Sequence, residues 1–249
     1  MRLVLSVLVA SLCLAAQNPP LKSGATAAKS PRPATNPRLL NPALFRAKAP
    51  DLYRAKFTTT KGDFVVEVKR QDAPLGADRF YNLVKAGFYS GVSFYRVLAN
   101  ALVQFGLSPN PAVTKAWSTA PIKDDPVKLG NKPGVITFAN AGPNTRTTQL
   151  FINMRDMSGQ LDTMGFAGFG TVTEGMEVVK NLYSGYGEMK DMGGAGPDQD
   201  LATKQGAAYL DKNFPSLDKI VSAAIVFPEP TAAPAKAAPK AAPKASPKK

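Results

Sequence analysis

Residues 139–152 read ANAGPNTRTTQLFI and combine a turn-rich loop with side chains that suit a small binding site. The apolar run after Gln149 is typical of a strand, and side chains two residues apart on a strand point to the same side. Gln149 and Phe151 would therefore project onto one surface. A polar amide beside an aromatic ring predicts a site with an apolar floor and a polar rim.

Composition excludes several kinds of catalysis. The 249 residues include no histidine and a single cysteine, Cys13. Imidazole acid-base chemistry, Ser-His nucleophiles and thiolate metal sites are therefore not available. The stretch GFAGFG (165–170) is typical of a turn and lacks the surrounding pattern of a phosphate loop. The stretch DMGGAGPDQD (191–200) is typical of an acidic loop, with a loose set of calcium ligands as the alternative. We expect no cofactor and no metal.

The first 16 residues, MRLVLSVLVASLCLAA, have the pattern of a secretory signal peptide. An early positive charge precedes a short apolar run and small residues, which predicts cleavage near Ala15 or Ala16. A lipoprotein attached through Cys13 and an uncleaved membrane anchor are the alternatives. The first prediction makes the protein exported, either periplasmic or secreted, without cysteine in its mature form.

The formal net charge of +13 belongs to the two ends of the chain. Residues 17–50 are a Pro/Ala-rich basic stretch that predicts a flexible linker, and residues 231–249 repeat A-A-P-K and predict a disordered tail. The tail is either a solvated spacer or an electrostatic contact to anionic envelope surfaces. Residues 51–230 carry 19 basic and 18 acidic residues, so no specific nucleic-acid binding is expected.

Residues 51–230 predict one folded domain dominated by short strands. Strands are expected at 56–60 and 64–68 around a Lys-Gly-Asp turn, and a helix is expected at 75–86 before Gly87. Further strands are expected at SFYRVL, LVQFG, VITFAN, QLFINM, FGTVT and DKIVSAAIVF, and a second helix at EGMEVVKNLYSGYG. Many short strands with two helices favour a closed antiparallel β-barrel.

Three stretches in this order, SFYRVLANALVQFG, GVITFANAGPNTRTTQLFI and LDTMGFAGFGTVTEGMEVV, carry a resemblance. Over about residues 55–227 the chain resembles the cyclophilin family of peptidyl-prolyl cis-trans isomerases. The resemblance implies a mainly β fold, a closed eight-stranded antiparallel barrel capped by two α-helices, with the active groove on its outer face. It also implies proline-containing polypeptides as partners and, we expect, a monomer.

Carried over position by position, the resemblance implies roles for individual residues. The catalytic residues would be Arg96, Gln104 and Asn140. The substrate-binding residues would be Ala101, Leu102, Ala139, Ala141, Gln149, Phe151, Leu161 and Phe166. In this reading Phe151 is the floor of a proline pocket, Leu102 and Leu161 are its apolar wall, and residues 139–141 bind the peptide backbone.

The chain also departs from the family's pattern. Asn100 and Ala101 stand where a Gly-Phe pair is common, Leu102 replaces a methionine, and Phe166 replaces a histidine. The usual pocket tryptophan is missing near Gln160. The main hypothesis is an exported isomerase that assists protein folding. A proline-peptide-binding chaperone or scaffold with little turnover is the alternative, and a protein whose main task is envelope anchoring through its Lys-rich ends is a third.

Overall fold

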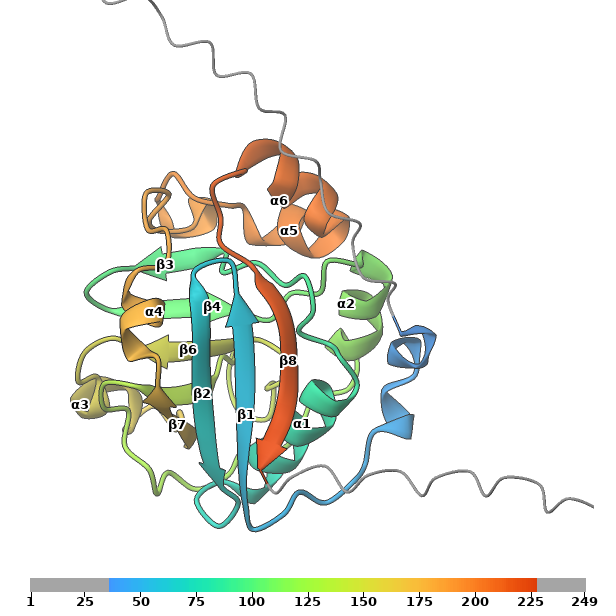
Figure 1. The fold of residues 1–249 in the computed structure, drawn as a ribbon, viewed down its shortest axis with the longest axis vertical. Helices are drawn as coiled ribbons and strands as arrows, with labels where there is room; N and C mark the ends of the chain where they lie inside the picture. The colour runs from blue at the N-terminus through green and yellow to red at the C-terminus, as the bar shows by residue number, and fades with distance from the viewer. Residues whose placement is uncertain (1–35, 228–249) are drawn as a thin grey trace, which may run out of the picture. The chain divides into compact units, whose positions relative to one another are not determined.

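The computed structural model describes residues 36–227 of the chain. Eight strands form one antiparallel sheet in the order β3-β4-β6-β5-β7-β2-β1-β8. The strands are β1 (Leu52–Thr59), β2 (Gly62–Lys69), β3 (Arg96–Leu98), β4 (Leu102–Phe105), β5 (Val135–Phe138), β6 (Leu150–Asn153), β7 (Gly168–Glu174) and β8 (Ile220–Phe227). The sheet curls, so that β3, β4 and β6 run across β1, β2 and β8 (Figure 1). The predicted mainly β, antiparallel architecture is confirmed.

The barrel is not fully closed, and the prediction is wrong on that point. Strands β3 and β8 are the two edges of the sheet and form no ladder with each other. The chain just before β3 approaches β8 through an isolated bridge between Ser93 and Lys219 and a 3.0 Å bond from the Phe94 amide to the Asp218 carbonyl. Because β3 has only three residues, it is too short to continue this pairing along the eight residues of β8.

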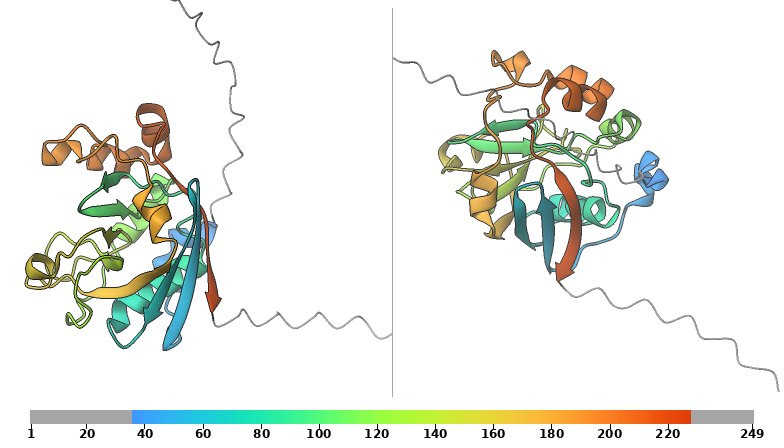
Figure 2. Two further views of the ribbon diagram at one scale, coloured as in Figure 1. Left: turned by 60° about the vertical axis from the view of Figure 1, so that its left-hand side comes forward. Right: turned by 45° about the horizontal axis from the view of Figure 1, so that its top comes forward.

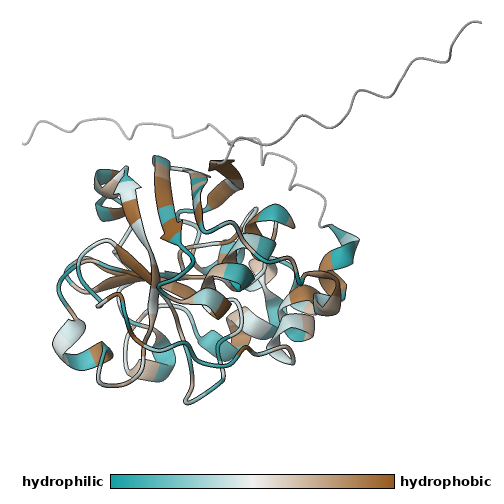
Figure 3. Ribbon diagram, turned by 90° about the horizontal axis from the view of Figure 1, so that it is seen from below, coloured by the Kyte–Doolittle hydropathy of each residue, from teal (hydrophilic) through white to brown (hydrophobic). Residues whose placement is uncertain are grey.

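Apolar side chains fill the inside of the curled sheet. In β1 every second residue is buried, as expected of a strand with one face on a core. Phe57 of β1 and Phe64 of β2 stack with ring centroids 4.9 Å apart, and Phe80 and Phe169 lie 5.0 Å apart. Hydrophobic residues are concentrated on the strands (Figure 3). This core is the rigid base on which any site on the outer face must stand.

The helices lie around the sheet. They are α1 (Pro74–Lys85), α2 (Pro111–Ser118), α3 (Ser158–Leu161), α4 (Met176–Lys180), α5 (Gln199–Gln205) and α6 (Ala207–Asn213), with 3-10 turns η1 (Pro37–Leu40), η2 (Pro42–Leu44) and η3 (Lys190–Met192). The predicted helix at 75–86 is α1 to within one residue at each end. Gly87 has the expected left-handed conformation, with φ of 73°.

The expectation of two helices is wrong for the described residues. The second predicted helix, at 174–187, is helical only over α4, and the chain then continues as a loop. Helices α2, α3, α5 and α6 were not predicted, because each has only four to eight residues and too few apolar positions for a periodic pattern. Helices α5 and α6 lie at the β3 end of the sheet (Figures 1 and 2).

The flexible linker predicted for residues 17–50 is wrong for residues 36–50. This part forms η1 and η2 and places Leu39 in the core at 2% exposure. The Trp117 indole donates a 2.9 Å hydrogen bond to the Leu39 carbonyl, and the Phe45 ring lies 5.7 Å from Trp117. The proline-rich composition of this stretch predicted a linker, because its few apolar residues form no periodic pattern. The predictions for 1–16, 17–35 and 231–249 lie outside the described residues.

Candidate active site

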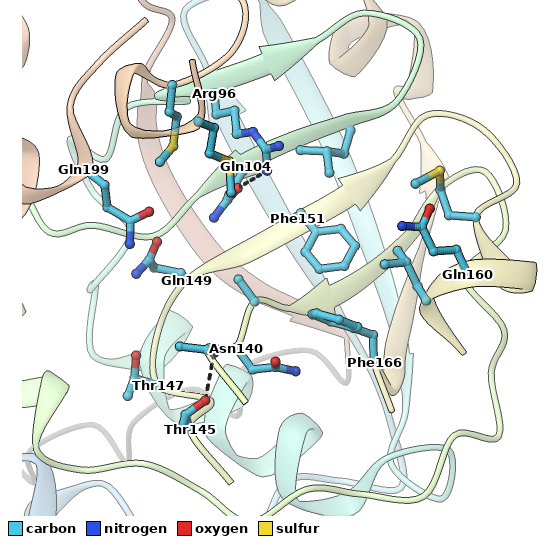
Figure 4. Close-up of a pocket in the computed structure, with 17 residues that line it drawn as sticks. Arg96, Gln104, Asn140, Thr145, Thr147, Gln149, Phe151, Gln160, Phe166 and Gln199 are labelled. Atoms are coloured by element: carbon cyan, nitrogen blue, oxygen red, sulfur yellow. Dashed lines mark hydrogen bonds between the residues drawn. The ribbon is translucent and has the colours of Figure 1, made fainter. Parts of the chain in front are cut away.

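A cavity of about 400 Å³ opens on the outer face of the sheet. It is lined by Arg96, Leu102, Gln104, Ala139, Asn140, Ala141, Thr145, Thr147, Gln149, Phe151, Met157, Gln160, Leu161, Phe166, Met189, Met192 and Gln199 (Figure 4). The structure therefore brings together all of the sequence-predicted site residues except Ala101. Ala101 lies in the turn between β3 and β4, where its amide bonds to the Leu98 carbonyl.

The strand register places three of these side chains in a row. Arg96 on β3 is paired with Gln104 on β4, and Gln104 is paired with Phe151 on β6. Directly opposed residues share a face of the sheet, so the three side chains lie side by side. The next row, Val97, Val103 and Ile152, points the other way and is buried in the core.

The apolar part of the cavity has Phe151 as its floor. Phe151 is 5% exposed, and its ring centroid lies 5.8 Å from that of Phe166 in an edge-on arrangement. The Phe166 amide bonds to the Leu161 carbonyl, which fixes these two wall residues relative to each other. Asn131 holds the same loop by donating a 2.7 Å hydrogen bond to the Phe166 carbonyl. Figure 4 shows Phe151 between the Arg96–Gln104 pair and Phe166. The result is a preformed apolar pocket.

The polar rim consists of amides and hydroxyls. The Tyr95 hydroxyl donates a short hydrogen bond to Gln149 Oε1. Burial raises the pKa of Tyr95, so its hydroxyl remains a donor at any ordinary pH. In the loop after β5, Thr145 Oγ1 accepts a 2.8 Å bond from the Ala141 amide, and Asn140 Oδ1 accepts from the Gly142 amide at 3.2 Å. These local bonds shape the 139–145 loop that forms one side of the cavity.

The Arg96 guanidinium is held from two sides. Its Nη1 donates a 2.9 Å hydrogen bond to Gln104 Oε1. Its Nε donates a 2.7 Å bond to Glu188 Oε1, and its Nη2 donates a 2.7 Å bond to Glu188 Oε2. Burial alone would raise the pKa of Glu188, but the hydrogen bonds from Arg96 and from the Met189 amide outweigh it and lower that pKa. Glu188 is therefore ionised at neutral pH, and the pair is a true ion pair.

Sequence reasoning missed Glu188 and seven of the lining residues. The missed lining residues are Thr145, Thr147, Met157, Gln160, Met189, Met192 and Gln199. Thr145 and Thr147 alternate with Gln149, and this spacing of two was the available signal. Glu188 lies 92 residues after Arg96 in the chain. Nothing in the sequence indicated that the segment after α4 folds back to contact Arg96.

Metal-binding clusters and membrane-spanning helices are not found in residues 36–227. Among residues 36–227 no group of three or more His, Cys, Asp or Glu side chains is arranged to hold a metal ion. In the same range no helix is both long enough and apolar enough to cross a bilayer. The cavity thus offers an arginine, several amides and an apolar floor, a combination that suits a ligand with both polar groups and a compact apolar part.

The chain belongs to the cyclophilin-type peptidyl-prolyl cis-trans isomerase family, whose family model matches residues 54–200. The resemblance stated from the sequence is confirmed. The match ends before α6 and β8.

Individual relatives agree with this assignment. The chain is 34% identical over 129 residues to a peptidyl-prolyl cis-trans isomerase of Acinetobacter baylyi, covering 50% of this chain and 68% of the relative. It is 35% identical over 130 residues to peptidyl-prolyl cis-trans isomerase-like 1 of Rhizopus delemar, covering 50% and 76%. A cyclophilin-type isomerase of Cryptosporidium parvum, solved in the presence of the dipeptide Ala-Pro, shares the fold with a TM-score of 0.50 at 19% identity, covering 69% of this chain and 98% of that one.

Proposed function

We propose that this protein catalyses cis-trans rotation about X-Pro peptide bonds in proline-containing polypeptides, with Arg96 as the catalytic residue. The observation that carries the proposal is the row formed by Arg96, Gln104 and Phe151 beside one cavity. A proline ring on Phe151 would place the bond that rotates next to the guanidinium. No nucleophile, metal or change of protonation is required.

The chemistry follows from amide resonance. Rotation about the C–N bond faces a barrier of about 18–20 kcal/mol because resonance holds the amide planar. At the twisted transition state the proline nitrogen becomes pyramidal and its lone pair is localised. A donor aimed at that nitrogen bonds to the transition state and hardly at all to the planar ground state, which is the differential binding that catalysis needs. Arg96 stays charged throughout the ordinary pH range.

The number of free donors on Arg96 is consistent with this role. A guanidinium has five N–H groups. Three are engaged, two by Glu188 and one by Gln104. One N–H on each terminal nitrogen is left for a bound peptide. Arg96 thus remains a donor while its own position is fixed.

The remaining lining residues would hold the peptide still. Phe151, Leu102, Leu161 and Phe166 would enclose the proline ring. The backbone of Ala139, Asn140 and Ala141, together with Gln104, would bind the flanking peptide. With the proline ring held in the pocket, rotation about the X-Pro bond is confined to the group on the other side of that bond. This removes part of the entropic barrier.

Exchange spectroscopy by NMR tests the proposal. An Ala-Pro peptide is observed with catalytic amounts of protein, wild type beside Arg96→Ala, and both are checked for the same folded spectrum. Wild type should accelerate exchange, and Arg96→Ala should lose about 10²- to 10³-fold of that acceleration, as for the loss of a preorganised donor elsewhere. If the two proteins accelerate exchange equally, Arg96 is not the catalytic residue.

A binding function with little turnover is the second candidate. It is favoured by the ion pair at Arg96, in which the Glu188 carboxylate offsets the positive charge of the guanidinium, and by the absence of Ala101 from the cavity lining. In that case the wild-type protein would bind the Ala-Pro peptide, seen as chemical-shift changes at Phe151 and Gln149, and leave the exchange rate unchanged.

We also propose that the isomerase acts on exported proteins and is itself periplasmic or secreted. The support is the signal-peptide pattern of residues 1–16 and the lack of cysteine after Cys13. Fractionation of cells that express the chain with and without residues 1–16 tests this: the full chain should leave the cytoplasm and the truncated chain should stay. Deleting residues 231–249 tests whether the Lys-rich tail contributes a salt-sensitive attachment to the envelope.

A further inference from the structure

The pair between Glu188 and Arg96 assigns a role to a residue outside the predicted site. We propose that Glu188 is a positioning residue for the isomerisation, which holds the Arg96 guanidinium in one orientation toward the bound peptide. The inference rests on the proposed function, since it presumes that Arg96 is catalytic. Glu188 contacts Arg96 through both carboxylate oxygens at 2.7 Å and does not line the cavity itself.

The geometry of the contact determines the guanidinium plane. An arginine side chain has many rotamers, and a single hydrogen bond leaves its head free to turn. Two parallel bonds to one carboxylate fix the plane, and the third bond to Gln104 fixes its tilt toward β4. Both partners are mostly shielded from solvent, with 15% of the Arg96 side chain and 29% of the Glu188 side chain exposed. The arginine is therefore ordered before a peptide arrives.

Glu188 can do this because its own position is fixed. Its Oε1 accepts a 2.7 Å hydrogen bond from the Met189 amide, and its carbonyl accepts a 2.8 Å bond from the Gly196 amide. A Cβ atom on Gly196 would lie 2.7 Å from the Glu188 carbonyl oxygen, so the chain can fold back on Glu188 only where it lacks a side chain. The chain from Glu188 to Gly196 thus closes a turn on the Glu188 backbone, and the Met189 amide holds the carboxylate.

The loop is also packed against the strand that carries Arg96. Met189 is 1% exposed and belongs to a small apolar cluster with Tyr95, Leu107, Leu210 and Leu217. Tyr95 is the residue immediately before Arg96. The neighbours of both members of the ion pair therefore pack in one apolar cluster, to which α6 contributes Leu210. Separating Arg96 from Glu188 would require this cluster to come apart.

The arrangement points to positioning and not to inhibition. A carboxylate that blocked the site would cover the arginine, but Arg96 remains part of the cavity lining and keeps one free N–H on each terminal nitrogen. Because the pKa of Glu188 is lowered, the carboxylate is charged and the pair is complete at neutral pH.

Variants of Glu188 test the proposal in the full chain. Glu188→Ala should lower the exchange rate of the bound Ala-Pro peptide by about tenfold or more, because a misplaced catalytic group loses that much, while peptide affinity changes far less. Glu188→Gln, which keeps the shape and loses the charge, should lie between Ala and wild type. Glu177→Gln removes an equivalent charge from the exposed face of α4 and should leave the rate unchanged.

A double-mutant cycle with Arg96→Ala separates positioning from other effects. If Glu188 acts through Arg96, adding Glu188→Ala to Arg96→Ala should cause no further loss. If the two losses multiply, or if Glu188→Ala accelerates exchange, the proposal is overturned. Matching folded spectra of all variants exclude loss of structure as the cause.

One readout does not depend on activity and distinguishes failure of this inference from failure of the proposed function. Nitrogen-15 relaxation of the Arg96 Nε–Hε group should show a rigid side chain in wild type and a mobile one in Glu188→Gln. If wild type is inactive yet shows this difference, the positioning stands and the proposed function fails. Equal mobility in the two proteins overturns the positioning.

Discussion

Replacing Leu39 by alanine tests whether the N-terminal segment is part of the folded domain. Leu39 is 2% exposed and packs in the main core, so the change removes a fully buried side chain. Such changes cost about 2–5 kcal/mol of unfolding free energy. Leu39 lies in the short turn η1 and not in the sheet, so we expect the lower end of this range, about 2 kcal/mol.

The fluorescence of Trp117, the single tryptophan of the chain, reports whether the N-terminal segment stays packed against α2. Trp117 is 1% exposed and donates its indole hydrogen bond to the Leu39 carbonyl. If the segment detaches in Leu39→Ala, about 1 kcal/mol more is lost with that bond and the emission of Trp117 shifts to the red. Urea unfolding gives the free energy, and the emission maximum before the transition shows whether the segment has left.

Leu44→Ala is the matched control, because Leu44 is in the same segment and 50% exposed. It should change stability by less than about 0.5 kcal/mol. If Leu39→Ala behaves like Leu44→Ala in both stability and emission, the segment is not docked against α2 and the reasoning from burial is refuted.

Three further predictions concern the site and the barrel. Phe151→Ala should weaken binding of an Ala-Pro peptide by about tenfold or more, because it removes the apolar floor, and an unchanged affinity in NMR titration would place the proline elsewhere. The pKa of Glu188, measured by carbon-13 NMR, should lie below its reference value of 4.5 and should rise in Arg96→Gln. Because the pKa is lowered in the folded protein, the ion pair stabilises the fold at neutral pH. This stabilisation is lost as the pH falls through the pKa of the folded protein. Gly175 has a φ of 76°, and a Cβ atom there would overlap the Asp63 carbonyl oxygen of β2, so Gly175→Ala should destabilise the fold by about 1–3 kcal/mol in urea unfolding. Gly159→Ala is the control, because a Cβ atom there meets open space, and it should not destabilise the fold.

The elements that were predictable are those whose signal is local. The hairpin of β1 and β2 has β-branched and aromatic residues around a Lys-Gly-Asp turn, with alternating burial in β1, and α1 has an apolar face and Gly87 after its end. The row of Arg96, Gln104 and Phe151 was predictable only through family resemblance, because a strand register cannot be read from one strand at a time.

The features that escaped prediction depend on contacts between distant parts of the chain. Glu188 meets Arg96 only after the loop beyond α4 folds back, and Leu39 is buried only because Trp117 on α2 provides a surface for it. Neither carries a local pattern. Helices as short as α5 and α6 are stabilised by packing and not by propensity, so their sequences look like loops.

The alternation of the two rows across β3, β4 and β6 has a consequence for how this protein can change over time. Arg96, Gln104 and Phe151 face the cavity, and Val97, Val103 and Ile152 face the core at the neighbouring positions of the same strands. A slip of one residue would exchange the rows, burying a charge and exposing three apolar side chains. Selection for a stable interior therefore also preserves the alignment of the site, so an insertion or deletion of one residue in these strands would remove stability and activity together.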